Sequence, residues 1–152
     1  MSNVTELGIY RMFDDVKKPS FGTSGSACFD ICAYSPERQF ILCKKGEVTL
    51  VSTGIIFDIP AGYSVRLHPR SGISIKHGIT LINAEGVIDS DYVNEVKVPI
   101  INHGSSDFNI VHGMRICQAE LVRDIPMVTR EIYSAPGQKT DRTGGFGSTG
   151  SI

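Results

Sequence analysis

The amino-acid sequence predicts an all-β protein built as a sandwich, jelly roll or barrel. Short runs alternate apolar with polar residues, and Gly, Pro, Asn or Asp separates most of these runs. In residues 63–68, for example, Tyr, Val and Leu alternate with Ser, Arg and His. No segment has the periodicity of a long amphipathic helix. Many short strands at this spacing are typical of closed or stacked antiparallel sheets.

The expected strands follow one another along most of the chain. They are Ile9–Phe13, Ala27–Ala33, Gln39–Cys43, Glu47–Val51, Gly54–Ile59, Tyr63–His68, Ile79–Ile82, Glu95–Ile101, Phe108–His112, Arg115–Arg123 and Met127–Tyr133. One short helical turn is expected from Ser71 to Lys76. Strand signal stops near Tyr133, and residues 134–152 hold five of the 16 glycines. We therefore expect a β domain over residues 1–133 and a flexible C-terminal segment over residues 134–152.

Composition limits the classes of function. A chain of 152 residues with 41% hydrophobic residues suggests one globular domain. Its net charge of −1, with no Lys/Arg cluster, disfavours a nucleic-acid partner. No apolar run is long enough for a membrane span and no secretory signal is visible, so we expect no membrane partner and a cytoplasmic, reducing location. The four cysteines lack metal-site spacing, so buried thiols are favoured over a thiolate metal centre.

Asn83–Tyr92 is the stretch with the most chemistry. It places an amide, a glycine bend, two carboxylates and an aromatic ring between two expected strands, in a hairpin-sized segment. Its backbone could recognise the edge of a base, with Asn83 adding an amide and Tyr92 covering a sugar face. The alternatives are an acidic surface turn or a calcium loop, although Val93 and Asn94 stand where the calcium pattern requires a ligand and a glycine.

Two other segments suit phosphate groups. In Pro69–Gly72, Arg70 could grip phosphate oxygens while Ser71 and its neighbouring amides donate from the start of the helical turn. The tail Arg142–Gly150 offers a guanidinium, glycine amides, hydroxyls and one Phe, which would suit a lid over phosphates and a ring. The tail is not a P-loop, and no nucleophile signature is present anywhere in the chain.

Together, five segments resemble the motifs of the homotrimeric deoxyuridine triphosphatases, in that family's order and over nearly the whole chain. The segments are Ser26–Ala33, Pro69–Ile73, Gly86–Tyr92, Gly113–Gln118 and Gly144–Gly150. The resemblance implies a β jelly roll, or distorted β-barrel, of the dUTPase type. It also implies a homotrimer whose active sites are shared between chains. The implied reaction is hydrolysis of dUTP to dUMP and pyrophosphate with Mg²⁺.

The resemblance also implies roles for particular residues. Asp89 would activate the water that attacks the α-phosphorus, and Arg70 and Gln118 would assist it. Asp30 would engage Mg²⁺ through coordinated water. Adding Asn83 from the argument above, the expected substrate-binding set is Arg70, Ser71, Gly72, Asn83, Gly86, Ile88, Asp89, Tyr92, Lys97, Gln118, Arg142, Phe146, Gly147, Ser148 and Thr149.

The chain departs from the family pattern at three places. Val93-Asn94 stands where Arg-Gly is usual, Met114 replaces a common acidic residue, and one residue rather than two separates Arg142 from the Gly pair that follows. Two other functions are possible on this fold. One is a dCTP deaminase-like enzyme, which would release ammonia from dCTP. The other is a regulatory binding protein switched by nucleotide, whose protein partner the sequence does not identify.

Overall fold

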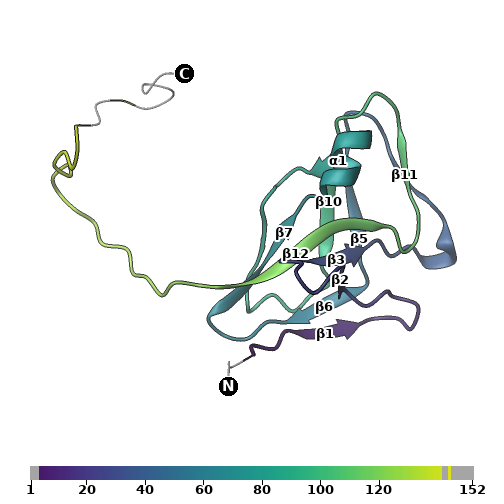
Figure 1. Ribbon diagram of the computed structural model, residues 1–152, viewed down its shortest axis with the longest axis horizontal. Coiled ribbons are helices and arrows are strands. Elements are labelled where there is room, and N and C mark those ends of the chain that lie inside the picture. The colour runs from purple at the N-terminus through teal and green to yellow at the C-terminus, as the bar shows by residue number, and fades with distance from the viewer. Residues whose placement is uncertain (1–3, 142–143, 145–152) are drawn as a thin grey trace.

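The computed structural model describes residues 4–141 and 144, which form a β-rich body from which residues 124–141 lead away (Figure 1). In chain order the elements are β1 (Gly8–Arg11), β2 (Ser20–Phe21), β3 (Phe29–Cys32), η1 (Pro36–Arg38), β4 (Ile41–Cys43), β5 (Val48–Ser52), β6 (Ile55–Asp58), β7 (Tyr63–His68), α1 (Ser71–His77), β8 (Ile79–Leu81), β9 (Gly86–Ile88), β10 (Lys97–Asn102), β11 (Phe108–Ile110) and β12 (Arg115–Arg123). The all-β prediction is therefore confirmed, including the short helix after Arg70. No helix within the described ranges is long and apolar enough to cross a membrane.

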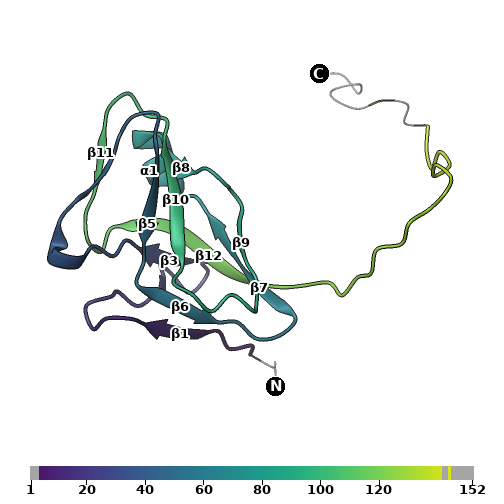
Figure 2. The same ribbon diagram turned by 180° about the vertical axis from the view of Figure 1, so that it is seen from behind.

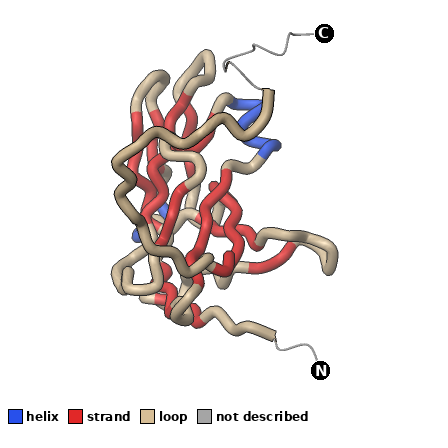
Figure 3. The backbone as a smooth tube through the Cα atoms, turned by 90° about the vertical axis from the view of Figure 1, so that its left-hand side faces the viewer, coloured by secondary structure: helices blue, strands red, loops and turns tan. Residues whose placement is uncertain are grey.

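The strands pair antiparallel in every sheet of the described residues. The largest sheet has the order β2-β3-β12-β7-β9, and a second has the order β5-β10-β8. Strand β1 pairs with β6 and β11 pairs with β4. Figure 3 shows the strands gathered into packed layers, and the pairing in residues 4–141 closes no barrel. The arrangement is a jelly roll of stacked sheets.

Alternating residues of these sheets form one core. In β7, Val65 and Leu67 are buried, whereas Arg66 and His68 on the other face are only half-buried. In β10 the buried residues Val98 and Ile100 alternate in the same way. Because the period of the side chains fixes which face each residue occupies, the core and the polar face of each strand follow directly from the sequence.

Asn102, at the end of β10, is a polar residue with none of its surface exposed. Its Nδ2 donates to the carbonyls of Cys43 and Ser106 at 2.9 and 3.0 Å, and its Oδ1 accepts from the Gly104 amide at 2.8 Å. Nearby, α1 ends at Gly78 in the left-handed region with φ 69°, where a side chain would also collide with the backbone of Gly104. These contacts fix α1 and the far end of β10 to the body.

The structure differs from the prediction in four segments, one of which is the short 3-10 helix η1, which was not expected. Met127–Tyr133, expected as a strand, contains none, and its side chains face water, with Val128 94% exposed. A strand needs a neighbour for its backbone groups, and the described part of the chain provides none there (Figure 2). Two short strands were missed, β2 and β9. β9 lies inside the expected hairpin. β8 pairs with β10, but β9, which comes between them in the sequence, pairs with β7 in the other sheet.

Candidate active site

A cavity of about 170 Å³ lies where β9 leaves the β8–β10 pair. Its lining contains the predicted residues Asn83, Gly86, Ile88, Asp89, Tyr92 and Lys97, together with Leu67, Val87, Val96 and Pro99. The structure therefore brings together the residues of the Asn83–Lys97 stretch that the sequence assigned to base and sugar. We call this space the base cavity. Its mixture of apolar walls and a few polar groups is typical of small-ligand sites.

Strand β9 gives the base cavity a backbone edge. It is the last strand of the five-stranded sheet and, within the described residues, pairs with β7 alone. The other edge of an outermost strand presents N–H and C=O groups that a ligand can pair with. Gly86 allows the strand to approach β7 closely, since a Cβ there would lie 3.2 Å from Cβ of Leu67 and 3.5 Å from Nδ2 of Asn83. A side chain at this position would narrow the cavity.

The rim of the base cavity is held by Glu95, a residue that sequence reasoning missed. The hydroxyl of Tyr92 donates to the Glu95 carbonyl at 2.9 Å. The Glu95 carboxylate accepts from the Gly54 amide at 2.9 Å and lies 3.8 Å from Nζ of Lys97. Val93, at the position where the family usually has Arg, is 69% exposed. Glu95 thus orients the ring of Tyr92, which is 40% exposed, at the mouth of the cavity.

A second cavity of about 540 Å³ contains the groups suited to phosphate. Its lining includes the predicted residues Asp30, Arg70, Ser71, Gly72 and Gln118, and also Gly22, Ser26, Ala27, Cys28 and Arg115. We call it the phosphate cavity. Ser71 and Gly72 begin α1, where the first amides of a helix have no partner within the helix itself.

Asp30 organises the cations of the phosphate cavity. Its Oδ1 accepts from Nε of Arg70 at 2.8 Å, and its Oδ2 lies 3.3 Å from Nη1 of Arg115. Gln118 donates to the Pro69 carbonyl at 2.9 Å, which orients its amide beside Arg70. Met114, next to Arg115, replaces the acidic residue expected there, and in the structure Arg115 has Asp30 as its carboxylate partner. Asp30 and Arg115 are 85 residues apart, so spacing gave no signal of this contact.

The phosphate cavity fits a magnesium ion bound chiefly by phosphate and water. Among the described residues, no group of three His, Cys, Asp or Glu side chains could hold a metal by itself. Asp30 supplies one carboxylate, which is 16% exposed, and each of its oxygens still has a lone pair for water after accepting from arginine. Mg²⁺ keeps several waters and prefers phosphate oxygens, so this donor set suits water-mediated contact.

The cysteines belong to the core more than to the site. Cys43 and Cys117 are fully buried, and burial raises the pKa of the Cys117 thiol, with smaller contributions from Cys32 and Asp30. Burial likewise raises the pKa of Cys28, which lines the phosphate cavity. Thiols that resist ionisation are poor nucleophiles and poor metal ligands. The expectation of buried thiols is confirmed for Cys43 and Cys117, whereas Cys28 and Cys32 are only half-buried.

The two cavities have no lining residue in common. Asp89 lines the base cavity, whereas its expected partners Arg70 and Gln118 line the phosphate cavity. A single chain thus contains both halves of the predicted site at separate places on its surface. The expected tail residues Arg142, Phe146, Gly147, Ser148 and Thr149 lie outside the described residues.

The fold and the two cavities define an antiparallel β protein whose amide, carboxylate and guanidinium groups suit a phosphorylated ring compound. The model of the dUTPase family matches residues 14–150, and the chain belongs to this family. The deoxyuridine 5'-triphosphate nucleotidohydrolase of Brucella melitensis is 45% identical over 153 aligned positions, covering 98% of this chain and 96% of its own length. The enzyme of the same name from Finegoldia magna is 45% identical, covering 87% and 90%.

Solved structures confirm the fold. The dUTPase of Staphylococcus bacteriophage 80alpha, solved with dUpNHpp, superposes with a TM-score of 0.84 at 20% identity, covering 97% of this chain and 99% of that one. A mutant dUTPase from phage phi11 of S. aureus, whose structure describes the coordination of a structural Mg(II) ion, has a TM-score of 0.75 at 17% identity, covering 86% of this chain and 98% of that one. The predicted dUTPase-type jelly roll is therefore confirmed.

Proposed function

We propose that this protein is a dUTP diphosphatase, which hydrolyses dUTP to dUMP and pyrophosphate. The observation that carries the proposal is the base cavity, which places the free edge of β9, Asn83, Tyr92 and Asp89 around one space of ligand size. The family and the names of the relatives at 45% identity support the same reaction. Removal of dUTP would keep uracil out of DNA, and the reaction would also supply dUMP.

Uracil specificity follows from fixed backbone groups. The edge of β9 near Gly86 and Ile88 offers donors and acceptors in a set order, and cytosine would present the opposite pattern at two positions. Mispaired buried groups of this kind can give discrimination of about 10⁴-fold. Thymine is excluded by its methyl group because the cavity is small, at about 170 Å³. The ring of Tyr92 packs on deoxyribose where a ribose 2′-hydroxyl would collide.

The phosphates bind in the phosphate cavity. Arg70, with Ser71 and Gly72 at the first turn of α1, directs N–H groups at phosphate oxygens, and Arg115 adds a second guanidinium. Gln118 lies beside Arg70, where its amide can orient water or an oxygen of the chain of phosphates. Hydrolysis of a phosphoric anhydride needs chiefly positioning and neutralisation of developing charge, which these donors supply.

Asp89 acts as the general base. It takes a proton from water as the water oxygen attacks the α-phosphorus, and the bond from that phosphorus to the bridging oxygen of pyrophosphate breaks. Mg²⁺, when bound, would supply positive charge to the phosphate oxygens, and Asp30 is the residue that would hold it through water. Asp30 also keeps Arg70 aligned. Asp89 is an exposed side chain on the connection after β9, so it is accessible to water and substrate.

Each complete site is shared between copies of the chain, in a homotrimer. Asp89 and Arg70 must meet at one α-phosphate, yet they line cavities with no common residue. An apolar strip beside the base cavity supports this assembly: Leu50 is 61% exposed and lies opposite Pro99, which lines that cavity, and Ile82 next to Pro99 is 55% exposed. The tail of a further copy supplies Phe146 over uracil, and Arg142, Gly147, Ser148 and Thr149 on the phosphates.

The test is a pyrophosphate-release assay across dUTP, dTTP, dCTP and UTP, with and without Mg²⁺. We expect release from dUTP alone at appreciable rate, and a large loss of rate when the metal is chelated. Equal rates with dTTP or UTP would contradict the assignment of the base cavity. Ammonia released from dCTP would identify a deaminase instead.

A further inference from the structure

A network of charged side chains lies on the outer face of the largest sheet, outside both cavities. Arg66 of β7 contacts Glu85 at 3.2 Å through Nη1 and Asp124 at 3.6 Å through Nη2. His68, also on β7, contacts Glu120 of β12 at 2.9 Å and Glu85 at 3.8 Å. Ser64 completes the network by accepting from Nε of Arg66 and donating to Asp124.

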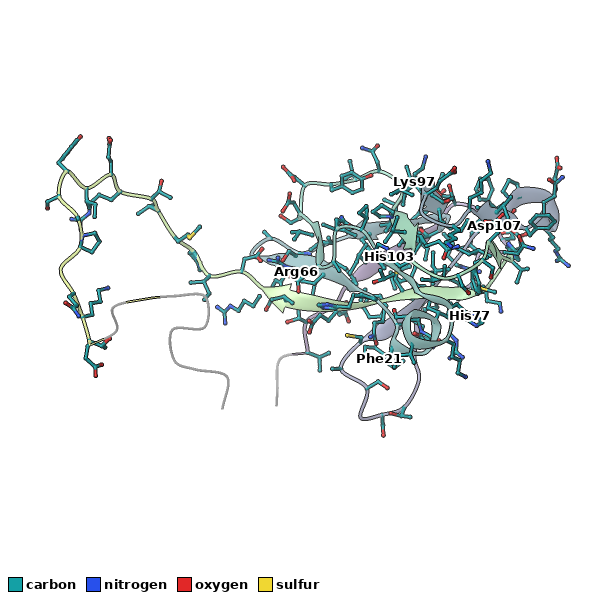
Figure 4. The ribbon with its side chains drawn as sticks, turned by 90° about the horizontal axis from the view of Figure 1, so that it is seen from above. Phe21, Arg66, His77, Lys97, His103 and Asp107 are labelled. Carbon is teal, nitrogen blue, oxygen red and sulfur yellow. The ribbon has the colours of Figure 1, made fainter. Side chains whose placement is uncertain are left out.

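The register of the sheet explains why these groups meet. Arg66 is opposite Val87 and Leu67 is opposite Gly86, so Glu85 is the next residue along and comes opposite His68. Residues two apart on a strand share a face, which places Arg66 and His68 together on the side away from the core. Figure 4 shows Arg66 at the end of the body from which the C-terminal segment leads away.

Glu85 connects this outer network with the base cavity. It directly precedes Gly86 and follows Asn83 by two residues, and both of those residues line the cavity. Residues 82–85 are exposed and belong to no strand. At one end of this turn, the Ile82 amide donates to the Pro99 carbonyl at 3.1 Å. At the other end of this short turn, Glu85 contacts Arg66 and His68 of β7 through its side chain.

We propose that Arg66 and His68 are positioning residues for the base cavity: by holding Glu85 from outside the sheet, they set the placement of Asn83 and Gly86 inside it. The proposal rests on the proposed function, because it takes the base cavity as the place where dUMP binds. The side chains of Arg66, His68 and Glu85 are 26–43% exposed, so each pair is weak and the expected effect is moderate. It should also be confined to ligands that contain the base, since Arg66, His68 and Glu85 do not line the phosphate cavity.

The test compares Glu85→Gln, Arg66→Gln and the double variant in the full-length protein. Binding of dUMP and of inorganic pyrophosphate is measured by calorimetry, together with KM and kcat for dUTP. We expect each single variant to bind dUMP about three- to tenfold more weakly, with KM raised and kcat nearly unchanged. The double variant should bind dUMP no more weakly than the weaker-binding of the two single variants, because both substitutions remove the Arg66–Glu85 pair. Arg66→Lys, which keeps the charge, should recover part of the loss.

Glu47→Gln is the matched control, since Glu47 is exposed and has no ion pair among the described residues. It should bind dUMP as the parent does. Two results would overturn the proposal: dUMP affinity unchanged in both single variants, or pyrophosphate affinity falling by the same factor as dUMP affinity, which would indicate general loosening. Failure of the parent protein to bind dUMP would instead remove the proposed function and the positioning role together. A thermal melt of each variant verifies that it is folded.

Discussion

Arg70 donates through Nε to Oδ1 of Asp30 at 2.8 Å, and the carboxylate therefore occupies part of the guanidinium that would face a phosphate. Arg115 contacts the other oxygen of the same carboxylate. Two cations thus share one anion. The carboxylate aligns both arginines, but it also lowers the positive potential that an incoming or departing polyphosphate experiences.

Replacing Asp30 with Asn tests this balance. We expect pyrophosphate to bind about three- to tenfold more tightly without Mg²⁺, because both guanidinium groups lose their competing anion. Turnover of dUTP should nonetheless fall, since the residue proposed to hold metal-bound water is gone. Calorimetry and the pyrophosphate assay measure the two effects. Asp14→Asn, at an exposed position without an ion pair in the described residues, is the control. Weaker pyrophosphate binding in Asp30→Asn would show that the carboxylate chiefly supports the arginines.

Replacing Asp89 with Asn tests the general base. An amide cannot take the proton from water, so kcat for dUTP should fall by about 10²- to 10⁴-fold. Affinity for dUMP should change by less than about threefold, because the backbone edge and Tyr92 remain. Single-turnover kinetics and calorimetry check the two quantities. The comparison is Asp91→Asn, two residues further on and outside the lining of the base cavity. A rate within threefold of the parent would remove Asp89 from this role.

Ending the chain after Ala135 tests the proposed lid. The described residues after 135 are exposed, so the shortened protein should stay folded and oligomeric while hydrolysis is severely weakened. Circular dichroism, size-exclusion chromatography and the pyrophosphate assay provide the three readouts. Unfolding or dissociation of the shortened protein would mean that the segment has a structural role instead.

Mixing two inactive variants tests whether sites are shared between copies. Asp89→Asn retains a sound phosphate cavity and Arg70→Ala retains a sound base cavity. Unfolding and refolding them together should restore activity in about a quarter of the sites if the two halves come from different copies and mix at random. Each variant refolded alone provides the baseline. If the mixture stays at that baseline while mixed oligomers form, both halves must come from one copy.

The buried thiol of Cys117 predicts a loss of stability in alkali. Burial raises the pKa of this thiol above its ordinary value of 9.0, so the folded protein keeps the proton that the unfolded chain releases. The stabilisation is complete below pH 9.0 and is lost as the pH rises above that value. The urea midpoint should therefore fall between pH 8 and pH 10 by more in the parent than in Cys117→Ala. An equal fall in both proteins would assign the effect to other groups.

Strand positions were predictable wherever one face of a sheet is buried. The alternation in residues 63–68 and 115–123 marks β7 and β12 because the side-chain period of a strand is two. β9 could not be found this way, since Gly86–Ile88 is too short to show a period and is flanked by turn residues such as Asn83 and Asp89. Met127–Tyr133 shows the opposite error: its residues favour a strand, but no strand in the described part of the chain pairs with it.

The residues of the site could be predicted from the sequence, but the contacts between them could not. Motif order identified Asp30, Arg70 and Gln118, and all three line one cavity. That Asp30 pairs with Arg70 depends on β12 lying between β3, which holds Asp30, and β7, which leads to Arg70. This relation between distant segments is not encoded in composition. Glu95 was overlooked for a similar reason, because its carboxylate reaches the Gly54 amide, 41 residues earlier in the chain.

The segment after β12 leaves Ile125, Met127 and Val128 each more than 80% exposed. A single copy would therefore expose an extended apolar segment to proteolysis and to aggregation with unfolded chains. At low abundance, newly synthesised copies should be degraded quickly unless they assemble with further copies of the chain. The amount of enzyme in a cell would then depend on how quickly copies meet as well as on how fast they are made.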